Sequence, residues 1–122
     1  MNLQDIITKL DLKALSSVEA DFSSIKPTCG YTSDLLSCVM AGAPKKSIWI
    51  TLQAHGNIIA VATLLDLSAV IITESAIPDE TTIEKANEEG VILLSTQLST
   101  YEVVGQLWEM GLRTADPDQP CP

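Results

Sequence analysis

Three short apolar runs separated by helix-like segments constrain the fold more than any other feature of this chain. The runs occupy residues 47–52 (SIWITL), 69–73 (AVIIT) and 91–95 (VILLS). Continuous apolar strands of this kind are typical of parallel sheets, whose strands are buried on both faces. The segment 57–67 between two of them is apolar almost all round, which indicates a helix buried on more than one side. The pattern predicts a three-layer α/β/α fold with a mainly parallel sheet and right-handed crossovers.

The remaining elements follow from caps and turn residues. We expect a short strand at 13–15, another near 30–33, and helices at 3–10, 35–41, 57–67 and 79–90, with a last helix from about residue 100. Four side chains are expected to cap these helices: Asn2, Asp34, Asn57 and Ser99, the last in a capping box with Glu102. In the last helix the spacing predicts that four side chains face the core: Val103, Val104, Leu107 and Trp108.

Composition limits the chain to one domain and excludes several partners. The 122 residues are 46% hydrophobic with a net charge of −9, and no linker divides them, so we expect a single domain at 1–112 and a flexible tail at 113–122. Lys and Arg are few and dispersed, which argues against nucleic acid and anionic membranes. No apolar run reaches membrane-spanning length, and the N-terminus lacks the pattern of a signal peptide.

The three cysteines form no framework spacing, which predicts reduced thiols and a cytoplasmic protein. Cys38 occupies an apolar helix position and is expected in the core. Cys29 stands at a turn and is expected to be semi-exposed. Cys121, in the Pro-rich tail, is expected to be exposed.

Polar side chains follow each of the three apolar runs. Gln53, His55 and Asn57 form the loop after the first run, and the turns at 73–75 and 95–97 place Thr73 and Thr96 after the other two. In a parallel sheet all strand-to-helix turns emerge at one edge, where ligands bind.

His55 is the sole histidine, the residue type whose unperturbed side chain changes charge near neutral pH, and a helix N-terminus there would favour a polar metabolite or an anion. The alternative is that Asn57 only caps the helix and His55 only satisfies backbone groups. A second polar cluster, before the helix at 35–41, consists of Tyr31, Ser33 and Asp34. No spacing indicates a metal or a cofactor.

The segments GYTSDLLSCVMAGA, IWITLQAHGNIIAVA and PDETTIEKANEEGVILLST resemble the DRTGG domain family, which is related to the N-terminal domain of HPr kinase/phosphorylase. The resemblance covers roughly residues 3–112 and is strongest to small stand-alone members encoded beside iron-only hydrogenase and redox-regulatory genes. It implies a regulatory or accessory domain of the HPr kinase N-terminal-domain type that forms dimers. The family motif, Asp-Arg, two variable residues and Thr-Gly-Gly, corresponds to residues 24–30. Thr28 and Gly30 are retained there, whereas the Asp, the Arg and the first Gly are not.

Relatives are sometimes labelled serine kinases, and the sequence opposes that activity. A phosphate cradle needs a G-x-x-x-x-G-K-[ST] run, and the nearest segment, 42–47, lacks the first glycine and contains Pro44, which removes an amide donor.

We therefore predict a non-enzymatic regulatory or ligand-sensing domain, linked by the resemblance to redox or hydrogenase metabolism. Its partners would be a small polar metabolite or a partner protein, and it would act as a homodimer, with residues 31–40 as the first choice of face. Two alternatives stay open: a pure interaction or dimerisation module, and a small enzyme that uses His55 as a general base.

Overall fold

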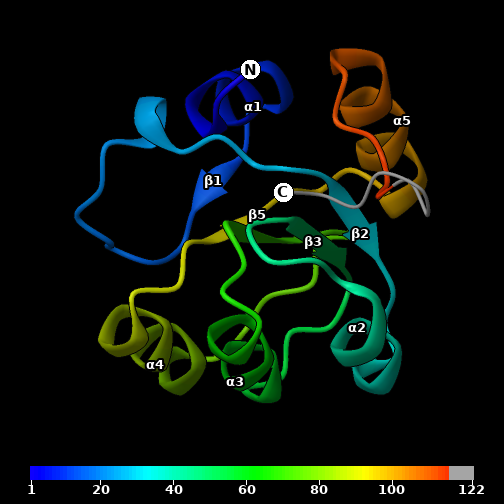
Figure 1. The fold of residues 1–122 in the computed structure, drawn as a ribbon. Coiled ribbons are helices and arrows are strands. Elements are labelled where there is room, and N and C mark those ends of the chain that lie inside the picture. Colours follow the sequence, from blue (N-terminus) through cyan, green and yellow to red (C-terminus); the bar gives the residue numbers. More distant parts are fainter. Residues whose placement is uncertain (116–122) are drawn as a thin grey trace.

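A five-stranded sheet forms the centre of the computed structural model, which describes residues 1–115 (Figure 1). The strands are β1 (Lys13–Ala14), β2 (Gly30–Thr32), β3 (Ile48–Thr51), β4 (Ala69–Ile72) and β5 (Leu93–Ser95), in the order β1-β5-β4-β3-β2. The pairs β2–β3, β3–β4 and β4–β5 are parallel, and β1 pairs antiparallel with β5. The expectation of a mainly parallel sheet with adjacent strands at 47–52, 69–73 and 91–95 is confirmed.

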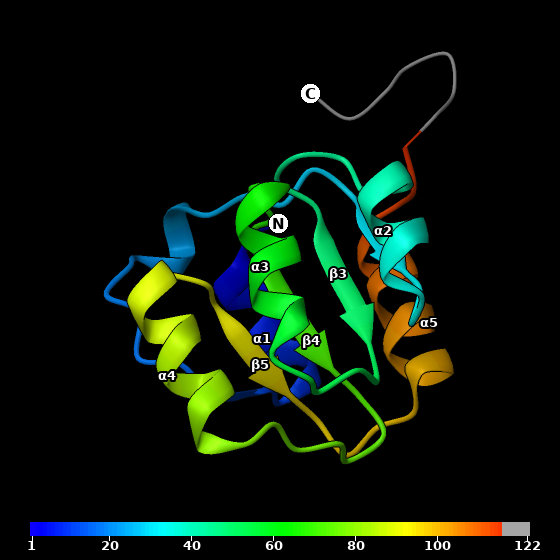
Figure 2. The ribbon, with the colours of Figure 1, turned by 90° about the horizontal axis from the view of Figure 1, so that it is seen from below.

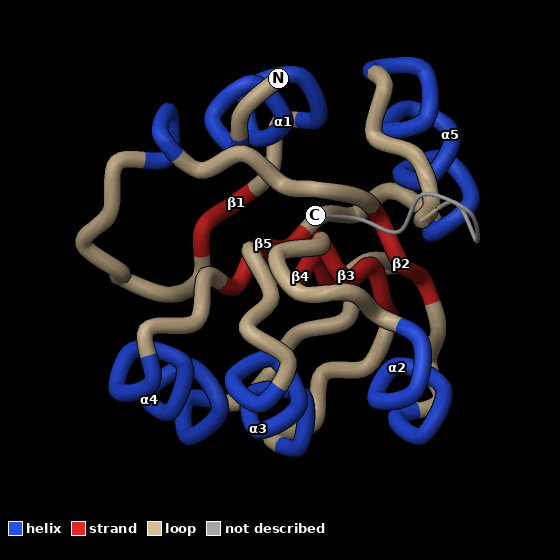
Figure 3. The backbone as a smooth tube through the Cα atoms, in the orientation of Figure 1, coloured by secondary structure: helices blue, strands red, loops and turns tan. Residues whose placement is uncertain are grey.

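Helices cover both faces of the sheet (Figures 1 and 3). Helices α1 (Leu3–Leu10) and α5 (Thr100–Met110) lie on one face. Helices α2 (Leu36–Gly42), α3 (Asn57–Leu64) and α4 (Glu80–Glu89) lie on the other, and a short 3-10 helix spans Phe22–Ser24. This arrangement is the three-layer α/β/α architecture that the sequence predicts. Among residues 1–115, no helix is long and apolar enough to cross a membrane.

The central strands are buried on both faces, because a helix layer covers each one. All four residues of β3 and of β4 are buried. Side chains alternate along a strand, so Ile48 and Ile50 pack toward α1 and α5, whereas Trp49 packs toward α2, α3 and α4. The sheet therefore separates two aliphatic cores, which is why its strands read as continuous apolar runs.

Two of the four expected caps are confirmed. The Asn2 side chain accepts from the backbone N–H of Asp5 within a capping box, and the Ser99 side chain accepts from that of Glu102. The other two expectations are wrong. Asn57 is the first residue of α3, whose N-cap is Gly56. Leu35 is the N-cap of α2, because the Asp34 carboxylate is engaged by β3 instead.

Trp108 does not face the core as expected, since 45% of its surface is exposed. Val103 and Leu107 are buried and Val104 partly so. The Arg113 guanidinium lies 4.5 Å from the centre of the Trp108 ring, and its Nε donates to the Trp108 carbonyl. The Arg113 carbonyl in turn accepts from the Gly30 N–H at 2.9 Å. The first residue of the expected tail thus makes contacts with the domain, and the tail from residue 116 on lies outside the described residues.

The cysteines also differ from expectation. Cys38 is an exposed free thiol, because it lies on the outer side of α2 while Val39 takes the buried position. Cys29 is 1% exposed rather than semi-exposed. It is disulfide-bonded, so the expectation of reduced thiols is wrong for this residue. Cys121 lies outside the described residues.

Candidate functional site

The candidate site lies where the parallel strands end. We call this side of the sheet the carboxyl edge: the loops that follow β2, β3, β4 and β5, at residues 33–35, 52–56, 73–79 and 96–99 (Figure 2). These loops emerge together because the four strands run in the same direction. Each of the eight sequence-predicted site residues is in or beside this edge.

The polar side chains near β2 and β3 bind one another. One carboxylate oxygen of Asp34 accepts from the Thr51 hydroxyl at 2.8 Å and from the Leu52 N–H at 3.0 Å. The Gln53 side-chain amide donates to the Asp34 carbonyl at 3.0 Å. This network ties the two strand ends together, so Asp34 and Gln53 are brought into contact as parts of the scaffold.

His55 and Asn57 lie further along the same loop, and both are exposed. The Nδ1 atom of His55 accepts from the Asn57 N–H at 3.2 Å, which satisfies a free amide at the start of α3. Across the loop, the backbone N–H of Thr82 holds the pKa of Asp79 below its usual value, with His55 contributing as a weaker positive neighbour. Neither of the two cavities described below is lined by His55.

Three further predicted residues have structural partners. Thr73 is fully buried, and its hydroxyl lies 2.6 Å from the Thr100 hydroxyl. The Tyr31 hydroxyl donates to the Cys38 carbonyl at 3.0 Å. The Ser33 hydroxyl accepts from the Leu35 N–H at 3.1 Å. These contacts join elements at the carboxyl edge, and Thr96 is the predicted residue that lines the cavity described next.

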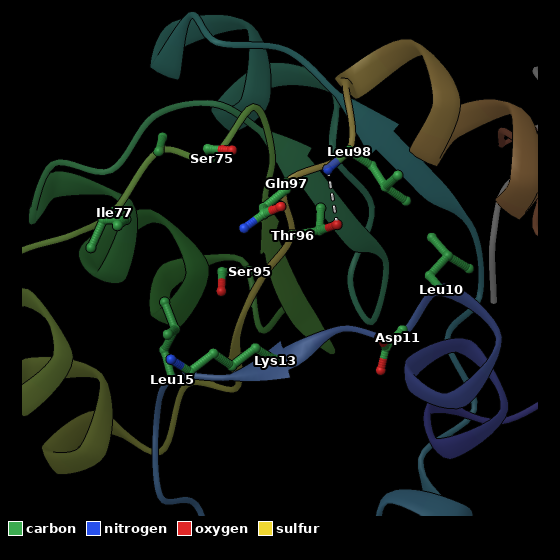
Figure 4. Close-up of a pocket in the computed structure, with 11 residues that line it drawn as sticks. Leu10, Asp11, Lys13, Leu15, Ser75, Ile77, Ser95, Thr96, Gln97 and Leu98 are labelled. Carbon is green, nitrogen blue, oxygen red and sulfur yellow. Dashed lines mark hydrogen bonds between the residues drawn. The ribbon is translucent and has the colours of Figure 1, made fainter.

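A cavity of about 610 Å³ opens at the β4–β5–β1 side of the carboxyl edge (Figure 4). We call it the edge cavity. Its polar lining comes from the end of α1, from β1 and β5, and from the turns after β4 and β5: Asp11, Lys13, Ser75, Ser95, Thr96 and Gln97. Leu10, Leu15, Ala76, Ile77 and Leu98 supply apolar walls. A cavity of this size suits a small-molecule ligand.

Most polar side chains of the edge cavity have no hydrogen-bond or ion-pair partner within residues 1–115. The exception is the Thr96 hydroxyl, which accepts from the Leu98 N–H at 3.1 Å. In the described part of the chain, the side chains of Lys13, Ser95 and Gln97 make no hydrogen bond or ion pair. Figure 4 shows Ser95 and Lys13 on neighbouring strands beneath Gln97. Such groups are available to a ligand without breaking an existing contact.

The turn that borders the edge cavity has an uncommon backbone. Glu74 and Ser75 both have φ of 61°, in the left-handed region that non-glycine residues rarely adopt. Two bonds to the neighbouring turn hold them there: Glu74 N–H to the Leu98 carbonyl at 2.9 Å, and Ser75 N–H to the Thr96 carbonyl at 3.2 Å. The turns after β4 and β5 are therefore hydrogen-bonded to each other and together form the rim of the cavity.

Sequence reasoning found Thr96 and missed its neighbours in the cavity. Ser75, Ser95 and Gln97 lie in the turns at 73–75 and 95–97, which the sequence already placed at the edge of the sheet, so they could have been predicted. Asp11 and Lys13 could not have been predicted from the sequence, because the antiparallel pairing of Lys13 with Ser95 brings them to the site.

A second, apolar groove of about 240 Å³ lies beside the edge strand β2. We call it the edge-strand groove. It is lined by β2, α5 and the segment after α5, with Tyr31, Val104, Leu107, Trp108 and Leu112 as its larger side chains. Among residues 1–115, no group of three His, Cys, Asp or Glu side chains could hold a metal ion.

Comparisons with known proteins bear on the fold. No family model matches the chain, and no curated protein matches it by sequence. In structure it is similar to the CBS and DRTGG domains of the regulatory region of Clostridium perfringens pyrophosphatase, solved in complex with the activator diadenosine tetraphosphate. The TM-score is 0.68 at 18% identity, over 84% of this chain and 44% of that chain. The likeness shows a shared fold and supports the DRTGG-like architecture that the sequence predicts. The chain spans less than half of the neighbour.

Proposed function

We propose that this chain is a non-enzymatic regulatory domain that binds a small polar metabolite in the edge cavity. The observation that carries the proposal is a cavity of ligand size in which the side chains of Lys13, Ser95 and Gln97 have no hydrogen-bond or ion-pair partner within residues 1–115. Its place at the carboxyl ends of parallel strands is where open α/β sheets bind ligands. The regulatory role of the structural neighbour's region agrees with this proposal.

The charges around the cavity favour a neutral or zwitterionic ligand. Asp11 and Lys13 give the lining one charge of each sign. The segments 32–36, 51–58, 73–80 and 95–102, which form the rest of the edge, contain five acidic residues and no Lys or Arg: Asp34, Glu74, Asp79, Glu80 and Glu102. A polyanion such as the neighbour's activator would meet a negative field here. We therefore expect a ligand of a different class from the neighbour's activator.

Isotope-edited NMR can test this site with stated probes: the free amino acids, adenosine and diadenosine tetraphosphate. We expect an amino acid or adenosine to shift the amide signals of Ser75, Thr96 and Gln97, and diadenosine tetraphosphate to bind more weakly. Gln97→Ala should weaken binding at least tenfold. His55→Ala is the matched control at the same edge, and both variants should cost less than about 1 kcal/mol of stability.

The opposite pattern would relocate the site. If His55→Ala weakens binding and Gln97→Ala does not, then the ligand is held by the predicted loop residues Gln53, His55 and Asn57. If no probe shifts any signal at the carboxyl edge, the metabolite class proposed here is wrong.

Two observations weigh against the enzyme alternative. The Nδ1 atom of His55 is occupied by a backbone N–H, and within residues 1–115 no side chain hydrogen-bonds to the ring. A general base needs a reacting group or an orienting partner within reach. A hydrogenase or redox link and a cytoplasmic location remain predictions from the sequence and its resemblance.

We also propose that the chain forms a homodimer through the β2 side of the sheet. The Gly30 N–H points away from β3 toward Arg113, and by strand alternation the Thr32 N–H points the same way, so β2 is an edge strand. The edge-strand groove lies beside it, with Trp108 45% exposed. Two copies meeting at the carboxyl edge would instead oppose five acidic residues each.

Sedimentation velocity tests this assembly. We expect the wild-type chain to be a dimer at micromolar concentration. Thr32→Pro should be monomeric, because proline has no backbone N–H to donate at the edge of β2. Ile77→Ser is the control and should remain a dimer, because Ile77 is exposed and lies away from β2. A monomeric wild-type chain would refute it.

A further inference from the structure

An exposed apolar group at the carboxyl edge lies among carboxylates and takes no part in the edge cavity. Leu35, Leu52 and Tyr101 are 60%, 45% and 89% exposed. We call them, with Asp34, Glu74 and Glu102, the acidic-apolar patch. Exposed large apolar side chains that gather in one place commonly mark interaction surfaces.

Hydrogen bonds connect the chain segments that carry Leu52 and Tyr101. Thr51, which precedes Leu52, accepts from the Thr73 N–H at 2.9 Å, and the Thr73 hydroxyl lies 2.6 Å from that of Thr100, which precedes Tyr101. Thr51 and Thr100 therefore both bind Thr73, and Leu52 and Tyr101 are the residues that follow them in the chain. Leu52 also continues the alternation of Ile48 and Ile50, which places it on the α5 side of the sheet.

The same contacts fix the carboxylates next to the apolar groups. Asp34 binds the Leu52 N–H through one oxygen at 3.0 Å. Glu74 binds the Thr100 N–H at 2.7 Å, one residue before Tyr101. Glu102 follows Tyr101 in the first turn of α5. Each exposed apolar side chain is thus adjacent in the chain or in contact with a carboxylate, and no Lys or Arg stands in the loops of this edge.

From this arrangement we infer that the acidic-apolar patch docks a basic segment of a partner protein, in which aliphatic or aromatic side chains alternate with Lys or Arg. Leu52 and Tyr101 supply the apolar contact, and Asp34, Glu74 and Glu102 supply a rim that attracts positive charge. A second copy of this chain is a poor occupant, because it would bring the same carboxylates and a net charge of −9 against them. An acidic or nucleic-acid partner is repelled for the same reason.

This inference is independent of the metabolite proposal, since the patch shares no residue with the edge cavity. The two sites are nevertheless joined: Glu74 binds both Leu98, which lines the cavity, and Thr100, at the start of α5.

Selection from a phage-displayed library of random peptides tests the partner class directly. The full chain is the bait, and a Leu52→Ser/Tyr101→Ser double variant is used to remove peptides that bind elsewhere. We expect the enriched peptides to be rich in Lys and Arg with interspersed large apolar residues. Enrichment of neutral or acidic peptides, or no enrichment that depends on the patch, would overturn the inference.

Affinities of one synthetic enriched peptide then assign the contacts. By fluorescence anisotropy, Tyr101→Ser and Leu52→Ser should each weaken binding at least tenfold. Glu102→Gln should weaken it two- to fivefold and reduce its dependence on salt. Leu64→Ser is the matched control, because Leu64 is 69% exposed at the far end of α3, and it should leave the affinity within twofold.

Two results would refute the assignment. One is an equal loss of affinity in Leu64→Ser. The other is a wild-type chain that is dimeric and patch variants that are monomeric, because the patch would then bind a second copy of this chain.

Discussion

Ser16 offers a sharp test of how the edge cavity is built, because its hydroxyl makes two hydrogen bonds between the N-terminal segment and the segment of β5. The Ser16 hydroxyl donates to the Val91 carbonyl at 2.8 Å and accepts from the Leu93 N–H at 2.8 Å. The side chain is 8% exposed. Since Lys13 and Leu15 line the cavity from the same segment, loss of this link should affect both stability and the site.

Ser16→Ala removes both bonds and leaves a buried donor and a buried acceptor without partners. An unsatisfied buried backbone group costs about 1–3 kcal/mol. Water can reach an 8% exposed position in part, which reduces the penalty. We therefore expect a loss of about 2 kcal/mol in the free energy of unfolding, a substantial part of the roughly 5–15 kcal/mol of a typical domain.

Urea denaturation followed by circular dichroism measures this loss. An unchanged m-value would show that the substitution changes the stability and not the surface exposed on unfolding. Ser17→Ala is the matched control, because the Ser17 side chain is exposed and only its backbone N–H is bonded, to Asn87. It should change stability by less than about 0.5 kcal/mol. Equal stabilities for the two variants would refute the role given to Ser16. Hydrogen exchange at the Leu93 amide should accelerate in Ser16→Ala alone.

Three further predictions test the local physics of the fold. Gly90→Ala should destabilise the chain by about 1 kcal/mol, because Gly90 ends α4 at φ 70° where a Cβ is strained. Gly105→Ala, within α5 and with open space around its Cα, should instead stabilise it by about 0.5–1 kcal/mol in the same thermal or urea titration; the same sign for both would contradict this account. Asp79 should contribute its cap to α4 at neutral pH and lose it in acid: its folded-state pKa is lowered by the Thr82 N–H, so the stabilisation is complete above the usual value of 3.8 and disappears as pH falls through the lower folded value. Asp79→Asn keeps a cap at every pH, so its urea midpoint should exceed that of the wild type only at low pH. Finally, Arg113→Ala should increase the solvent exposure of Trp108, read as a red shift of tryptophan emission, because the guanidinium covers that ring; Lys9→Ala, on the exposed side of α1, is the control.

Much of the fold could be predicted from the sequence because its determinants are local. The apolar runs at β3, β4 and β5 define buried parallel strands wherever the rest of the chain lies. The caps at Asn2 and Ser99 depend on a side chain and a backbone N–H three residues apart. The common direction of the strands then places His55, Thr73 and Thr96 at one edge of the sheet.

The tertiary structure alone decided which side chains are free for function. Asp34 has the residue type of a helix cap, but β3 presents Thr51 and the Leu52 N–H to it, and a carboxylate binds the donors that packing brings nearest. Trp108 and Cys38 have apolar helix positions but lie on outward faces, because helix orientation is set by contacts with distant strands. Lys13 and Asp11 reach the edge cavity through the antiparallel pairing of β1 with β5, across some eighty residues of chain. Periodicity and capping act over a few residues, whereas a cavity is made by segments that meet only after the chain has folded.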